Sequence, residues 1–116
     1  MTQSKVNFQV RKPSYKAAVI DIQGEMNAQA ESPLMEAYTQ ASSPGVQAII
    51  LNFSGLDYMN SSGIGLLVTL LIRVQRQKQK MLAYGLSEHY REIFSLTRLD
   101  SAIGIYTGEA EALAAL

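Results

Sequence analysis

The chain of 116 residues contains no cysteine and a single histidine, His89. The absence of cysteine excludes disulfides, thiolate metal sites and cysteine nucleophiles. His89 has no histidine companion with which to hold a metal, so we expect neither a metal site nor a cofactor. It would also have to serve as the base for any serine nucleophile, and no glycine-x-serine-x-glycine elbow surrounds Ser61. We therefore expect a protein that is not an enzyme.

An excess of charge of one sign is also missing, because Lys plus Arg is 10 and Asp plus Glu is 10. A neutral chain has no electrostatic reason to bind nucleic acid or an anionic membrane. The longest apolar run, Ile64 to Ile72, is too short to cross a bilayer, and residues 1–7 lack the apolar core of a signal peptide. We expect a cytoplasmic protein with no direct membrane insertion, folded as one domain over residues 1–116.

The spacing of apolar residues predicts an α/β domain with elements in the order ββαβαβαβα and a mixed, mostly parallel sheet. The expected strands are one around Val6 to Val10, then Lys16–Gln23, Val46–Phe53, Met81–Gly85 and Ile103–Tyr106. The expected helices are Asn27–Ser42, one from Ser61 or Ser62 to about Gln77, one capped by Ser87 that ends at Ser95, and one that follows Thr107. A turn at residues 13–15 would make the first two strands an antiparallel hairpin.

Helix caps refine these boundaries. Ser32 before Pro33 is typical of an N-cap followed by a proline in the first helical position, although a start at Asn27 also fits. Gly24 is expected to end the second strand. Ser87 and Thr107 are the expected caps of the last two helices.

The stretch Asn60-Ser61-Ser62-Gly63 joins a buried strand to a long amphipathic helix. Serine and glycine weaken a helix interior, so they indicate a helix start. The first amides of a helix lack internal partners and lie at the positive end of its dipole. A phosphoryl group on a serine there would add about −1.5 to −2 charge where it is tolerated. The simpler interpretation is that Asn60 or Ser61 is only an N-cap and the glycines permit close packing on the sheet.

The helix that follows predicts a candidate docking surface. At 3.6 residues per turn its core face would consist of Ile64, Leu67, Val68 and Leu71. The opposite side would carry Ser62, Leu66, Thr69, Leu70 and Arg73. Two outward leucines one turn apart, beside the serines, favour a protein-binding surface, although scattered exposed leucines are ordinary.

At these residues the chain resembles the anti-sigma factor antagonists, the bacterial branch of the STAS family, over nearly its whole length. The resemblance rests on Gly24 to Asn27, Leu51 to Gly65, Ile93 to Asp100, and Ile105-Tyr106. It implies a mixed sheet with helices mainly on one face. It also implies a non-catalytic protein that, when unphosphorylated, binds an anti-sigma factor that is a serine kinase. Phosphorylation of a serine at the start of the central helix would release that partner, and a metal-dependent serine phosphatase would reverse the change.

Carried onto this chain, the resemblance makes Ser61 the phosphoacceptor, with Ser62 as its neighbour. The expected partner-binding residues are Asn27, Asn60, Ser61, Ser62, Gly63, Leu66, Leu70 and Arg73. The family usually has aspartate where this chain has Asn27, Asn52 and Asn60. If all three lie near Ser61, the site is less negative, and we expect docking to survive while recognition by the kinase weakens. Equal phosphorylation rates for Asn60→Asp and the parent would contradict this hypothesis.

Two other functions fit the same sequence. The first is a STAS subunit of a membrane lipid-transport ATPase, in which the helix would dock permanently on the ATP-binding subunit and Ser61 would only cap it. The second is a weak nucleotide-binding protein, which no residue specifically supports, since Ser62-Gly63-Ile64-Gly65 lacks the Lys-Ser/Thr of a phosphate loop. An exposed apolar helix face would also permit a weak homodimer.

Overall fold

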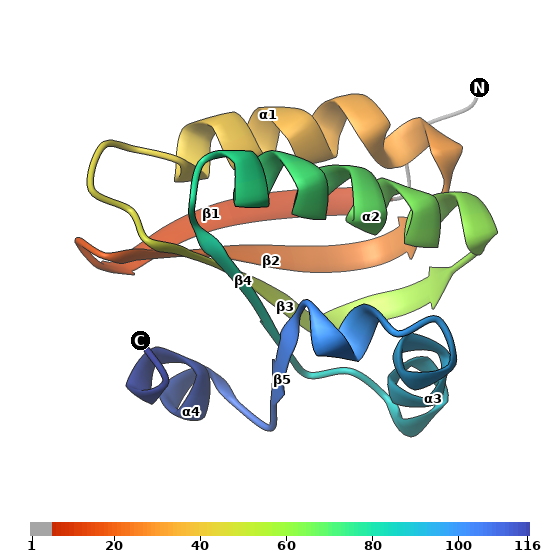
Figure 1. Cartoon of the computed structure of the whole chain (residues 1–116). Coiled ribbons are helices and arrows are strands. Elements are labelled where there is room, and N and C mark those ends of the chain that lie inside the picture. Colours follow the sequence, from red (N-terminus) through yellow and green to blue (C-terminus); the bar gives the residue numbers. More distant parts are fainter. Residues whose placement is uncertain (1–5) are drawn as a thin grey trace.

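The structure, a computed structural model, describes residues 6–116; residues 1–5 of the N-terminal stretch considered above lie outside the described part. Five strands form one sheet in the order β1-β2-β3-β4-β5 (Figure 1). β1 pairs with β2 antiparallel, and every other neighbouring pair is parallel. The predicted α/β class with a mostly parallel sheet is confirmed.

The order of the elements along the chain also matches the prediction, with two short 3-10 turns in addition. The strands are β1 (Val6–Ser14), β2 (Ala17–Met26), β3 (Ala48–Met59), β4 (Lys80–Tyr84) and β5 (Gly104–Tyr106). The helices are α1 (Glu31–Ala41), α2 (Ser61–Arg76), α3 (Glu88–Leu96) and α4 (Glu109–Ala114). The 3-10 turns are η1 (Ala28–Ala30) and η2 (Leu99–Ser101).

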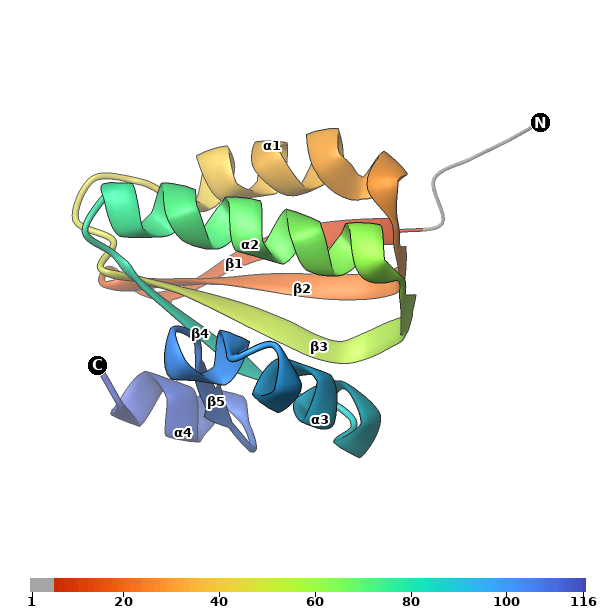
Figure 2. The same cartoon turned by 45° about the vertical axis from the view of Figure 1, so that its right-hand side comes forward.

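The helices lie mainly on one face of the sheet, as expected. Successive strand residues point to opposite faces, so each buried strand contributes to two apolar clusters. α1 and α2 lie side by side over one face, and Tyr90 and Phe94 of α3 join the same cluster (Figures 1 and 2). α4 covers part of the other face, where Ala112 packs on a smaller cluster that includes Val19 and Ile50.

β2 and β3 run past their predicted ends. β2 continues through Gly24, whose φ is 96°, and β3 continues past its predicted end at Phe53 to Met59. The extensions pair with each other, from Gln23 with Gly55 to Met26 with Met59, and two register shifts accommodate the irregular residues. Ladder pairing therefore overrides the low strand propensity of glycine and serine here.

The predictions at the start of the chain were partly wrong. β1 includes Pro13 and Ser14, and the turn is at Tyr15 and Lys16. Pro13 is tolerated because β1 is an edge strand, where one side of the backbone has no strand partner. Ser32 lies inside α1 and is not its N-cap.

The predicted caps of the other helical segments had mixed outcomes. The Oδ1 atom of Asn27 accepts a 2.9 Å hydrogen bond from the amide of Gln29 and so caps η1, which leads directly into α1. Ser87 caps α3, as predicted. The N-cap of α4 is Gly108 instead of Thr107, and its buried residue is Ala112.

Candidate functional site

The candidate site lies where β2 and β3 end, at their carboxyl ends. Met26 and Met59, the last residues of the two strands, are register partners. Asn27 and Asn60 follow them directly, so the starts of η1 and α2 lie at the same edge of the sheet (Figure 1). The structure thus brings these two predicted site residues together.

Asn60 is the N-cap of α2. Its backbone is extended, with φ −90° and ψ −177°, and its Oδ1 atom accepts a 3.0 Å hydrogen bond from the amide of Gly63. The Asn60 amide donates to the carbonyl of Met26 at 3.2 Å, which ties the helix start to the end of β2. The predicted helix start is confirmed, and the side-chain oxygen that asparagine shares with aspartate carries the cap.

Ser61 and Ser62 are the first two residues of α2, and both are exposed. Within residues 6–116, their amides and hydroxyls have no hydrogen-bond acceptor, and the first turn of α2 carries no acidic side chain. Free amides at the positive end of a helix dipole favour a negative group. The surroundings of Ser61 therefore suit a phosphoryl group electrostatically.

Gly63 is required for close packing. A Cβ atom there would lie 2.5 Å from the Met26 carbonyl oxygen and 2.8 Å from Cγ of Met59, closer than real contacts allow. Gly65 has no such constraint, because a Cβ atom at that position would meet nothing within 4 Å. The expectation that the glycines permit close packing on the sheet is thus confirmed for Gly63 and wrong for Gly65.

The predicted outward face of α2 was only partly right, because its polar residues are exposed but its two leucines are not. Leu66 and Leu70 are buried, with exposed fractions of 9% and 0%, whereas Val68 and Ile72 are 40% and 44% exposed. The buried positions are Gly63, Leu66, Leu67, Leu70, Leu71 and Val74, which is the predicted face shifted by one residue. The shift arises because α2 packs against α1 as well as the sheet, which widens its buried arc.

An exposed apolar stripe nevertheless begins at the candidate serine. Ser61, Gly65, Val68 and Ile72 are spaced by four, three and four residues, so they share one solvent-facing side of α2. Arg73 is exposed, as predicted, and its guanidinium lies over the Tyr38 ring, 5.0 Å from the centroid. The candidate docking surface is therefore the stripe of Ser61, Gly65, Val68 and Ile72.

Tyr90 is a residue at the site that the sequence did not reveal. Its hydroxyl oxygen accepts a 2.8 Å hydrogen bond from the amide of Met59, next to the cap of α2. The available signal was chemical, because a buried tyrosine hydroxyl needs a polar partner. The sequence pattern could not tell which backbone group that partner would be.

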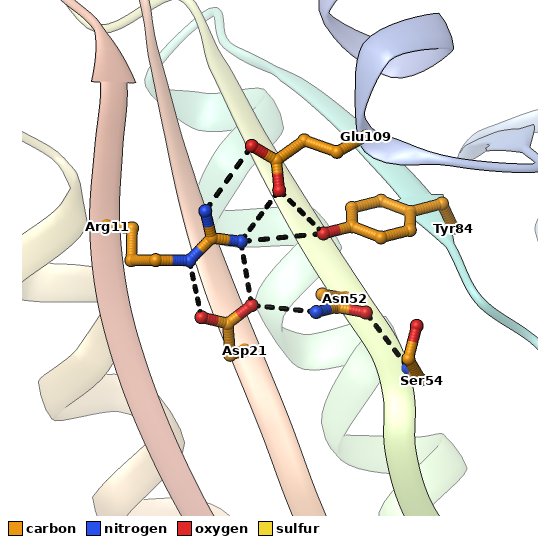
Figure 3. A network of polar contacts seen from close by, with 6 residues as sticks. All are labelled: Arg11, Asp21, Asn52, Ser54, Tyr84 and Glu109. Atoms are coloured by element: carbon orange, nitrogen blue, oxygen red, sulfur yellow. Dashed lines mark hydrogen bonds and ion pairs between the residues drawn. The ribbon is translucent and has the colours of Figure 1, made fainter.

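Asn52, the third asparagine, lies apart from Asn27 and Asn60. It belongs to a polar network on the face of the sheet that α4 covers (Figure 3). Its Nδ2 donates to Asp21 at 2.8 Å, and its Oδ1 accepts from the Ser54 amide at 2.9 Å. The condition that all three asparagines lie near Ser61 is therefore not met, and only Asn27 and Asn60 are candidates for altering its charge environment.

Arg11 is the centre of this network. Its guanidinium donates two hydrogen bonds to Asp21, at 2.6 and 2.9 Å, and two to Glu109 of α4, at 2.7 and 3.3 Å. These bonds from Arg11 are the main cause of the lowered pKa values of Asp21 and Glu109. Burial and the carboxylate of Glu109 raise the pKa of Tyr84 to about 12. The network thus ties α4 to β1, β2 and β4.

We expect Arg11→Met to lower the free energy of unfolding at neutral pH by about 1 kcal/mol, because half-exposed ion pairs are screened by solvent. The pKa values of Asp21 and Glu109 are lower in the folded chain than in the unfolded chain. The unfolded chain therefore binds more protons. The network's contribution to stability is complete above the pKa values of the two carboxyl groups in the unfolded chain, and it is lost as the pH falls through their lower values in the folded chain. Urea denaturation of parent and variant across this range measures the difference.

Lys12→Met is the matched control, because it removes the same charge from the next residue. Lys12 contacts the Ser43 hydroxyl, and no carboxylate is among its contacts within residues 6–116. We expect this control to keep the parent's dependence on pH. If the difference in free energy of unfolding between Arg11→Met and the parent stayed constant down to acid pH, Arg11 would not stabilise the fold through the ionised Asp21 and Glu109.

No metal or membrane-spanning element is found in the described part of the chain. Within residues 6–116, no three side chains of His, Asp or Glu gather closely enough to hold a metal ion. His89 is exposed and packs against the Tyr90 ring. None of the helices in the same range is long and apolar enough to cross a bilayer.

Comparison with known proteins places these features in a family. The sequence model of the STAS domain matches residues 8–112. A protein of Staphylococcus aureus named anti-sigma-B factor antagonist is 25% identical over 89 residues, which cover 77% of this chain and 82% of that protein. A Mycobacterium paratuberculosis anti-sigma factor antagonist has the same fold, with a TM-score of 0.79 at 18% identity over 95% of this chain and 92% of that one.

The Bacillus cell fate determinant SpoIIAA, solved in its phosphorylated form, is also similar. Its TM-score is 0.66 at 26% identity, over 93% of this chain and 97% of that one. The family match extends from β1 to α4 and includes the junction of β3 and α2 that carries the candidate serine. The chain belongs to the STAS domain family.

Proposed function

We propose that the protein is a cytoplasmic anti-sigma factor antagonist whose partner binding is switched by phosphorylation of Ser61. The observation that carries the proposal is the position of Ser61. It is exposed at the first position of α2, directly after the capping Asn60 and at the start of the apolar stripe. The names of the Staphylococcus aureus and Mycobacterium relatives support a regulatory binding protein that is not an enzyme.

The geometry of the helix start suits a switch that needs no large movement. The side chain of Asn60 accepts the hydrogen bond of the Gly63 amide. The amides of Ser61 and Ser62 remain free to donate to a phosphoryl group. The contact of Gly63 with Met26 prevents the first turn from moving toward β2. Phosphorylation would therefore place about two negative charges on a rigid surface without unfolding it.

The partner in this proposal is an anti-sigma factor with serine kinase activity. Its apolar groups would contact Val68 and Ile72, and the neutral Ser61 hydroxyl would lie at the edge of the same contact. A charge introduced there would have to be desolvated without a matching cation, which weakens an interface strongly. A serine phosphatase would restore the binding form.

The proposal is tested by affinity capture from the native cytoplasm and membranes with three baits. These are the parent, Ser61→Asp, and Ser95→Asp, which adds the same charge at an exposed position of α3. We expect a serine kinase to be retained by the parent and Ser95→Asp and lost from Ser61→Asp. Subunits of a lipid transporter retained equally by all three baits would overturn the proposal and favour the constitutive docking role.

A further inference from the structure

We propose that Tyr90 is a positioning residue of the switch, because its hydroxyl holds the end of β3 from which Asn60 and Ser61 project. The inference rests on the proposed function in one respect, namely that Ser61 is the phosphoacceptor. Tyr90 itself lies inside the molecule and contacts neither the serine nor the exposed stripe in the hydrogen bonds of the structure.

The end of β3 needs support on one side. β4 pairs with β3 only as far as Tyr84, which lies opposite Asn52, whereas β3 continues to Met59. Beyond Asn52 the sheet provides a strand partner on the β2 side alone. On the open side, the amide of Met59 donates a 2.8 Å hydrogen bond to the Tyr90 hydroxyl oxygen, and that hydroxyl lies 3.4 Å from the Met59 carbonyl. The Tyr90 side chain of α3 thus supplies the hydrogen bonding that a neighbouring strand would otherwise provide to Met59.

Burial makes the loss of this hydrogen bond costly. Met59 and Tyr90 are both buried, so water cannot readily replace the hydroxyl if it is removed. A buried amide without an acceptor is costly, and the strand end can recover a partner only by moving toward solvent. Such a movement would carry Asn60 with it, because Asn60 is the next residue.

Two constraints from β2 act on the opposite side of the same segment. The Asn60 amide donates to the Met26 carbonyl, and Gly63 packs on that carbonyl. The Ser61 hydroxyl has no hydrogen-bond partner within residues 6–116, so its position depends on the backbone that holds it. Removing the Tyr90 hydroxyl would leave that backbone held from β2 alone.

The test compares Tyr90→Phe with Tyr84→Phe, a matched control. Both tyrosine residues are 7% exposed, and the Tyr84 hydroxyl also donates a 2.8 Å hydrogen bond, to Glu109 on the opposite face of the sheet. The first readout needs no kinase: hydrogen exchange of the Asn60, Gly63 and Ile64 amides in the full chain. We expect exchange at these amides to be about fivefold faster in Tyr90→Phe and unchanged in Tyr84→Phe, as fits the loss of one net hydrogen bond.

The second readout is phosphorylation by the kinase captured with the parent. We expect kcat to fall about fivefold in Tyr90→Phe with KM unchanged, because the Val68 and Ile72 surface stays intact while the serine is held less firmly. Equal exchange and equal kinetics in the two variants would overturn the inference. Faster exchange throughout the Tyr90→Phe chain would also overturn it, because the effect would then be general loss of stability.

The two proposals fail in different ways. Faster exchange confined to Asn60, Gly63 and Ile64, without phosphorylation of Ser61 in the parent, would support the constraint from Tyr90 and overturn the proposed function. Phosphorylation of Ser61 at the same rate in the parent, Tyr84→Phe and Tyr90→Phe would support the proposed function and overturn the role of Tyr90.

Discussion

Gly63→Ala is expected to lower the free energy of unfolding by about 2–3 kcal/mol, even though alanine is the better helix residue by about 1 kcal/mol. The added Cβ would lie 2.5 Å from a backbone oxygen, that of Met26, which cannot rotate away as a flexible side chain could. The first turn of α2 would have to lift from β2. Chemical denaturation measures the change in stability, and the phosphorylation rate of Ser61 should fall with it.

Gly65→Ala is the matched control two residues along the same helix. Gly65 is exposed, and a Cβ there would meet nothing within 4 Å. We expect this change to raise the free energy of unfolding by about 0.5–1 kcal/mol, as alanine does in a helix interior. If the two substitutions changed stability equally, the contact between α2 and the end of β2 would not be as close as described.

Leu70→Ala is expected to cost about 2–5 kcal/mol of stability, because the side chain is fully buried and its removal leaves a cavity. Ile72→Ala, one of the exposed positions on the stripe, should change stability by no more than about 0.5 kcal/mol. Binding should show the reverse pattern, because Ile72 lies on the proposed docking stripe: Ile72→Ala should weaken capture of the kinase more than Leu70→Ala does. A Leu70→Ala variant as stable as the parent would contradict the burial of Leu70 and restore the outward position first expected for it.

The orientation of α2 shows why a sequence can predict a helix and still misplace its faces. The helix was identified correctly because its period and its capping residues agree, and the structure starts it at Ser61, one of the two starts expected. Its apolar residues, however, occur almost all round the axis, including Leu66, Leu67 and Val68. Two neighbouring phases therefore bury similar numbers of apolar groups. Packing against α1 decides between them, and that contact is made by a segment distant in the sequence.

The ends of β2 and β3 illustrate a second limit. Gly24 and the residues after Phe53 have the composition of turns, and only their mutual pairing makes them strands. This pairing places Asn27 beside Asn60, while Asn52 joins Asp21 on the other face. The three asparagines look equivalent in the sequence because each stands where the family usually has aspartate. The fold separates one of them from the site.

The most direct measurement of the central claim is to incubate the parent and Ser61→Ala with the captured kinase and ATP, and to map the phosphate by mass spectrometry. We expect one phosphate on Ser61 of the parent, none on Ser61→Ala, and loss of kinase binding by the phosphorylated parent. Phosphorylation at another residue, or a phosphorylated parent that still binds the kinase, would contradict the assignment of Ser61 as the switch.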